Sequence, residues 1–82
     1  MRLPRDLSSR DLIRGLERLG YEVSRQQGSH IRLTLASTGK HLTIPAHDPL
    51  KVGTLAAILR EVAAQVELPE DEVVARLSGR KL

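Results

Sequence analysis

The segment Gly28-Ser29-His30, followed by Ile31-Arg32-Leu33-Thr34-Leu35, determines how we interpret this chain. Glycine and serine favour a turn, and the residues after them alternate between apolar and polar side chains. This alternation predicts a strand with one buried face, because successive side chains of a strand point to opposite sides. The side chains expected in the core are Ile31, Leu33 and Leu35, and those expected on the exposed face are His30, Arg32 and Thr34.

His30 therefore begins the exposed face of this strand, which it shares with a cation and a hydroxyl group. Histidine is the one ordinary side chain that titrates near neutral pH without perturbation. A strand does not by itself require a histidine at this position, which suggests a chemical role. A solvated surface histidine is the alternative interpretation, and the triplet alone does not exclude it.

The composition limits the class of protein. The chain has 82 residues, enough for one domain with one small core, and we expect a single domain over residues 1–82. It has no cysteine, which excludes disulfides and thiolate metal sites, and its three histidines lack the spacing of a metal motif. No apolar run approaches the roughly 18 residues of a membrane helix, and the N-terminal segment lacks the apolar stretch of a secretory signal. We therefore expect a soluble cytoplasmic protein with no cofactor, metal or membrane partner.

The charge distribution favours a polyanionic partner. The chain has 13 lysine and arginine residues against 10 aspartate and glutamate residues, a net charge of +3, and most of the cations lie in residues 1–60. Such a positive field attracts nucleic acid, although it also serves to keep a small domain soluble. Tyr21 is the only aromatic residue, which argues against a platform of stacked aromatic side chains for single-stranded nucleic acid. Recognition of the RNA backbone and its 2′-hydroxyl groups needs no such platform.

A helix is expected on the N-terminal side of the sheet. Ser8 can cap it, Asp11 occupies the third position of a capping box, and Leu7 can pack on Leu12. Its apolar stripe comprises Leu12, Ile13, Leu16 and Leu19, and Gly20 is expected to end it. A first strand follows at residues 21–26, with Tyr21 and Val23 directed to the core and Glu22, Ser24 and Gln26 directed outward.

The second hairpin must keep the apolar residues of both strands on one face, which restricts its register. We expect the register that pairs Leu33 with Ile44 and leaves the loop Ser37–Lys40, with Gly39 in a left-handed conformation. The register that pairs Leu33 with Leu42 would leave Ser37 and Thr38 alone in a tight turn, for which both are poorly suited. Extended past Pro45, where the ladder is expected to end, the chosen register places His47 opposite His30.

The rest of the chain is expected to be helical. Residues 46–52 form a loop closed by Gly53, and Thr54 caps a second helix with the apolar stripe Leu55, Ile58, Leu59, Val62 and Val66. A short third helix is expected from Pro69 to Leu77, with acidic residues in its first turn, and residues 78–82 form a frayed tail. The expected fold is α+β, in the order α-β-β-β-α with an extra C-terminal helix and a three-stranded antiparallel sheet covered on one face.

The order of these segments and their residues resemble the HicA family of toxin ribonucleases, small mRNA-cleaving proteins paired with HicB antitoxins. The resemblance covers nearly the whole chain. It depends on Leu3-Pro4-Arg5, on Asp11-Leu12-Ile13-Arg14-Gly15-Leu16-Glu17-Arg18-Leu19-Gly20-Tyr21, on the turn Arg25-Gln26-Gln27-Gly28-Ser29-His30, on Leu42-Thr43-Ile44-Pro45-Ala46-His47, and on Gly53-Thr54-Leu55. Two positions depart from the family pattern: Ile31, where many members have a second histidine or an aromatic residue, and Val52, where the family often has proline.

The resemblance implies a fold like that of double-stranded-RNA-binding domains, cleavage of mRNA, and neutralisation by a HicB-type antitoxin encoded beside the toxin. It implies that His30 is the catalytic residue and that Gly28 and Ser29 belong to the turn that positions it.

The residues themselves suggest how RNA would be cleaved. RNA carries its own nucleophile, the 2′-hydroxyl group, so one histidine acting as a base or an acid supports the reaction. Arg32 is a candidate for binding the phosphate, and Lys51 with the backbone amides of Gly53 and Thr54 forms a second candidate anion site. Ordinary solvated cations are the alternative interpretation of Arg32 and Lys51. The sequence has no paired carboxylates, serine triad or P-loop, so a metal-independent mechanism is the simplest account.

The other histidines leave alternatives open. His47 is a second candidate acid or base if it faces His30, and otherwise a loop histidine bonded to backbone; His41, near the hairpin tip, is expected to be a surface residue. The leading hypothesis is an endoribonuclease toxin inhibited by a HicB-type antitoxin. The alternatives are a non-catalytic RNA-binding module of the same fold and a toxin-derived protein that binds an antitoxin but no longer cleaves RNA.

Overall fold

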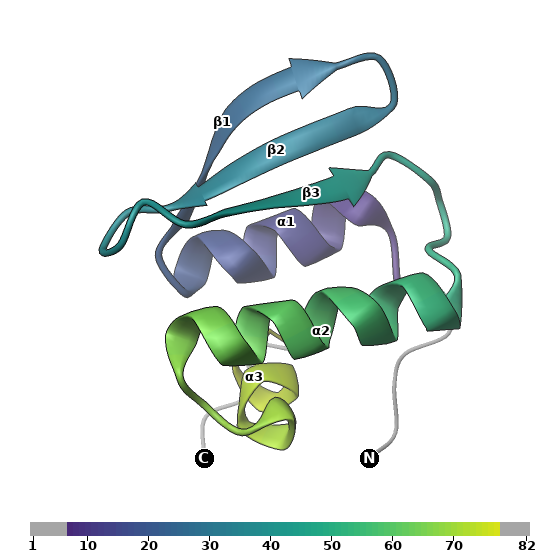
Figure 1. The fold of residues 1–82 in the computed structure, drawn as a ribbon. Helices are drawn as coiled ribbons and strands as arrows, with labels where there is room; N and C mark the ends of the chain where they lie inside the picture. Colours follow the sequence, from purple (N-terminus) through teal and green to yellow (C-terminus); the bar gives the residue numbers. More distant parts are fainter. Residues whose placement is uncertain (1–6, 78–82) are drawn as a thin grey trace.

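The structure, a computed structural model, describes residues 7–77 (Figure 1). Its elements are α1 (Ser9–Arg18), β1 (Tyr21–Gln27), β2 (His30–Leu35), β3 (His41–Pro45), α2 (Val52–Val66) and α3 (Glu70–Leu77). The strands form one antiparallel sheet in the order β1-β2-β3, so the strand that begins with His30 is the central one. The predicted α+β fold with an extra C-terminal helix is confirmed.

The molecule has a sheet layer and a helix layer. In Figure 1 the helices all lie on one side of the sheet, and no described element covers its other face. Helix α1 contacts β1, α2 contacts β3, and α3 packs against both α1 and α2. The inward side chains of β2 and β3 meet the apolar stripes of the two long helices in one core. This core contains Ile31, Leu33, Leu35, Leu42 and Ile44 from the sheet and Leu12, Leu16, Leu55, Leu59 and Val62 from the helices. Among residues 7–77, none of the helices has the length and apolar character needed to cross a membrane.

Helix α1 begins and ends at the predicted residues. The Ser8 hydroxyl accepts a hydrogen bond from the backbone N–H of Asp11 at 3.1 Å, which satisfies one of the free donors of the first turn. Gly20 follows the helix with φ +103°, a left-handed conformation that a side chain would disfavour. At the end of α3, the Arg18 guanidinium donates to the carbonyl oxygen of Leu77 at 2.6 Å, which links α1 to the C-terminal helix.

Strand β1 departs from the predicted alternation. Its register with β2 shifts between Val23 and Arg25, so Ser24 is the extra residue of a β-bulge. Tyr21 is buried, whereas all of β1 beyond it is exposed, and the prediction that Val23 belongs to the core is wrong. Val23 still faces Leu33 across the ladder, but β1 is an edge strand, and 45 % of the Val23 surface remains exposed.

The register predicted for the second hairpin is also wrong. Leu33 pairs with Leu42 and Ile31 with Ile44, which places Pro45 rather than His47 opposite His30. In this register the connection is not the tight turn of Ser37 and Thr38. It is a four-residue loop closed by Leu35 and Lys40, because the Leu35 N–H donates to the Lys40 carbonyl at 2.7 Å. The Leu35 carbonyl in turn accepts from the N–H groups of Thr38 and Gly39, at 3.2 and 2.7 Å. Gly39 has φ +78°, the predicted left-handed conformation, and thus lets residues 36–39 connect the strands in this register.

The helix boundaries after the sheet differ slightly from the prediction. Thr54 is not the N-cap of α2: the cap is Lys51, which makes no side-chain capping bond, and Thr54 lies inside the first turn. The preceding loop is held to α1, since the Asp48 carboxylate accepts bonds from the Ser9 N–H and hydroxyl at 2.8 and 3.2 Å. Pro69 immediately precedes α3 instead of opening it. The predicted frayed tail and the segment Leu3-Pro4-Arg5 lie outside the described residues.

Candidate functional site on the exposed face of the sheet

His30 lies where the sequence pattern placed it, at the start of the central strand on the uncovered face. Gly28 turns the chain with φ +59°, and the Ser29 carbonyl accepts a 2.7 Å bond from the N–H of Ala46, just after β3. His30 itself pairs with Gln27 on one side and Pro45 on the other. The backbone that carries the imidazole is therefore held from both sides, while the side chain is exposed and has no hydrogen-bond partner within residues 7–77.

Arg32 is exposed two residues further along the same face, as predicted. The bulge in β1 places Arg25 directly opposite it, and directly opposed residues project from the same side of a sheet. Simple alternation had directed Arg25 toward the core, so sequence reasoning missed it. No apolar residue follows Val23 in β1, so the pattern contained no signal that fixed the face of Arg25.

At the other end of the same face, a chain of hydrogen bonds crosses all three strands. The Ser24 hydroxyl donates to the carbonyl of Arg32 at 3.2 Å, and the Thr34 hydroxyl donates to the Ser24 oxygen at 2.9 Å. Each hydroxyl has one proton, so Thr34 has none left for His41, whose Nδ1 lies 3.0 Å from the Thr34 oxygen. His41 Nδ1 must therefore be the donor in this contact.

The remaining candidate residues gather beside the sheet rather than on it. His47, Lys51 and Thr54 line an open hollow with Pro45, the residue that faces His30. Gly53 and Thr54 line an adjoining hollow with Thr43 and Pro45. The backbone N–H groups of both residues belong to the first turn of α2, where helical amides lack partners in the helix, and that turn contains no acidic side chain. The structure thus separates the predicted site into His30 and Arg32 on the sheet face and a second group near the start of α2.

Residues 9–63 match the family described as the HicA toxin of bacterial toxin–antitoxin systems, a span that runs from the first residue of α1 into the last turns of α2. The chain belongs to the HicA toxin family. It is therefore a toxin of a toxin–antitoxin system, and its family implies an antitoxin partner. No curated protein and no solved structure matches the chain.

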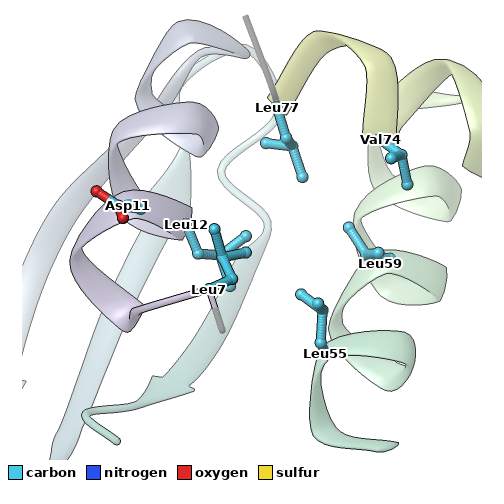
Figure 2. A pocket seen from close by; sticks show the side chains of 7 residues that line it. All are labelled: Leu7, Asp11, Leu12, Leu55, Leu59, Val74 and Leu77. Atoms are coloured by element: carbon cyan, nitrogen blue, oxygen red, sulfur yellow. The ribbon is translucent and has the colours of Figure 1, made fainter. Parts of the chain in front are cut away.

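The HicA match contains every candidate residue considered so far: the histidine turn, Arg25, Arg32 and the start of α2. Helix α3 lies beyond it and contributes instead to an apolar pocket of about 80 Å³ between the three helices. Figure 2 shows that the pocket is lined by leucine and valine side chains and by one carboxylate, that of Asp11, so it offers no proton-transfer pair. Within the described part of the chain, no group of three or more histidine, aspartate or glutamate side chains is placed to hold a metal ion.

Proposed function

We propose that this HicA-family toxin is an endoribonuclease that cleaves mRNA, with His30 as the residue that transfers protons. The observation that supports this most directly is the placement of His30: a free imidazole on the central strand of an uncovered face, with its backbone fixed on both sides. A rigid position and an accessible ring are what proton transfer to a bound substrate requires. A purely structural role would not leave the ring without a hydrogen-bond partner among residues 7–77.

The reaction begins when a base removes the proton of a ribose 2′-hydroxyl group and the oxygen attacks the adjacent phosphorus. The bond to the 5′ oxygen then breaks, and an acid gives that oxygen a proton, which leaves a 2′,3′-cyclic phosphate and a free 5′-hydroxyl. His30 can serve as base or acid, and each role typically contributes 10²- to 10⁴-fold to the rate. Arg32 is proposed to hold the phosphate through charge-assisted hydrogen bonds.

The residues near the start of α2 are proposed to bind the RNA backbone rather than to react. Lys51 and the first-turn amides of Gly53 and Thr54 offer positive charge and free donors to a phosphate. His47 lines the same hollow as Lys51. The pairing that would have made His47 a second acid or base does not form, so we assign His47 to RNA binding.

The antitoxin is proposed to be of the HicB type and to cover the sheet face that carries His30, because occupying the site is the simplest form of inhibition. Carboxylates on the antitoxin would contact Arg32 or Lys51. The outer side of α1, with Arg10, Arg14 and Arg18, is the alternative surface. A structure of the complex in which His30 remains open to solvent would reject direct occlusion.

The proposal is tested by induced expression of the wild-type chain, of His30→Ala and of His30→Gln, with growth and mRNA integrity as readouts. We expect arrest and mRNA decay from the wild type alone, because glutamine can hydrogen-bond but cannot exchange a proton near neutral pH. His41→Gln is the matched control: it removes a histidine from the same face, four residues along the ladder or about 13 Å away. A folded His30→Gln protein that degrades mRNA like the wild type would favour the RNA-binding module instead.

A further inference from the structure

We propose that Arg25 and Arg32 together form a phosphate-binding pair for the RNA strand, immediately beside His30, and that the bulge at Ser24 creates it. This inference rests on the proposed function, because it names residues that would hold the substrate of the same site. Arg32 alone was a candidate from the sequence; the pair is a product of the fold.

The register shows how the pair arises. Before the bulge, Tyr21 faces Leu35 and Val23 faces Leu33; if this pairing continued unbroken, Arg25 would face Ile31 on the helix side of the sheet. The extra residue shifts the pairing by one, so Arg25 faces Arg32 on the uncovered side. The bulge is fixed by two side-chain bonds on that side, from Ser24 to the Arg32 carbonyl and from Thr34 to Ser24. The relative position of the two arginines is therefore built into the sheet.

Within residues 7–77, no side chain neutralises the two guanidinium groups. Directly opposed like charges destabilise a sheet, and neither Arg25 nor Arg32 has an ion pair or a side-chain hydrogen bond within residues 7–77. The acidic residue of β1, Glu22, faces Thr34 at the far end of the ladder. A bound anion between the arginines would remove the repulsion and use the bidentate geometry that guanidinium groups offer to phosphate.

The neighbours of the pair identify the anion as a phosphate of the RNA backbone. The next residues of the two strands on the uncovered face are Gln27 and His30, which also face each other. Because residues two apart on one strand are about 7 Å apart, a phosphate on the arginine pair and a reacting phosphodiester at His30 can belong to neighbouring nucleotides. The single aromatic side chain, Tyr21, is buried, so base stacking cannot supply the affinity and backbone charge must.

The test measures RNA binding separately from cleavage. Full-length His30→Ala protein is titrated against a fluorescently labelled single-stranded RNA over a series of salt concentrations, with and without Arg25→Gln. Each phosphate contact contributes about 0.7 to the slope of log affinity against log salt for a single strand, so we expect Arg25→Gln to reduce the slope by about that amount. We expect Arg32→Gln to have the same effect, and Arg25→Lys to keep the slope while weakening binding, since it retains the charge without the fork.

The matched control is Arg60→Gln, an exposed arginine on α2, whose helix lies on the covered side of the sheet. It should leave both affinity and slope unchanged. In the active chain, Arg25→Gln should raise KM for RNA with little change in kcat. Thermal unfolding of each variant confirms that it is folded.

The outcomes separate this inference from the proposed function. If the wild type cleaves RNA but Arg25→Gln binds RNA like Arg60→Gln, the arginine pair is rejected and the ribonuclease function stands. If the wild type does not cleave RNA but the slope still falls with Arg25→Gln, the pair is supported and the catalytic proposal fails. If Arg25→Gln bound RNA like the parent protein but lost binding to an acidic protein partner, the inference would be overturned, because the arginine pair would then bind the partner and not RNA.

Discussion

The hydroxyl group of Tyr21 allows one prediction to be worked out in detail. Tyr21 is buried at the start of β1, and its hydroxyl donates to Gln65 Oε1 on α2 at 2.8 Å. Gln65 Nε2 in turn donates to the His41 carbonyl on β3 at 2.8 Å. This bridge connects both edge strands to α2. At pH 7 we expect Tyr21→Phe to destabilise the fold by about 1 kcal/mol, the net contribution of one hydrogen bond.

The pH dependence of that difference is the sharper part of the prediction. Burial, with a smaller contribution from the negative charge of Glu61, raises the pKa of Tyr21 from 10.0 to about 12. The folded state therefore favours the neutral phenol: this contribution to stability is complete below pH 10 and is lost as the pH rises through about 12. Two pKa units correspond to about 2.7 kcal/mol in total, of which about 1.4 kcal/mol is lost by pH 11.

The wild type should thus be about 1 kcal/mol more stable than Tyr21→Phe at pH 7 and slightly less stable than the variant at pH 11, because only the wild type has a phenol to ionise. Urea unfolding of both proteins at the two pH values measures the difference, and titrations common to both cancel. The chain has one tyrosine and no tryptophan, so the absorbance of tyrosinate reports this pKa alone. A stability difference that stays constant from pH 7 to pH 11 would refute the reasoning.

Two further predictions concern the helix packing and the hydrogen-bond chain. A Cβ at Gly15 would lie 2.9 Å from both the Cδ2 and the carbonyl oxygen of Leu77. Gly15→Ala should therefore loosen α3 and destabilise the fold by up to about 2 kcal/mol, after allowance for alanine's helix propensity, and hydrogen exchange in α3 measures this. The control Gly53→Ala, with open space around its Cβ, should not destabilise the fold. Thr34→Val removes the acceptor of His41 Nδ1, so nitrogen NMR should show the Nδ1–H tautomer dominant in the wild type and depleted in the variant. A wild-type ring that carries its proton on Nε2 would contradict the hydrogen-bond assignment.

The sequence predicted the parts of the fold in which polar and apolar residues alternate clearly. Strand β2 has an apolar side chain at every second position, and each falls on the predicted face. The Ser8 cap and the left-handed Gly20 and Gly39 were also predictable, because each position has a local chemical requirement that few residues meet. His30 could be placed because the alternation along β2 fixes the face of its first residue.

The errors occurred where apolar residues do not determine the geometry. Both registers of the second hairpin bury the same leucines and isoleucines, and the choice depended on a loop in which one carbonyl accepts two backbone bonds. Strand β1 has no apolar residue after Val23, so nothing in its sequence specified the bulge or directed Arg25 outward. The hairpin register and the bulge therefore depend on contacts between the strands. The register in turn separates His47 from His30, because Pro45 takes the position opposite His30.

Cleavage of RNA by the purified chain tests the central claim most directly. We expect the wild type to cut RNA in the presence of a chelator and to leave 2′,3′-cyclic phosphate ends, and to spare a substrate whose cleavage site lacks the 2′-hydroxyl group. His30→Gln should fold normally, since substitution of an exposed side chain changes the free energy of unfolding by about 0.5 kcal/mol at most. Its cleavage rate should nevertheless fall by about 10²- to 10⁴-fold. Wild-type cleavage rates from folded His30→Gln would contradict the account.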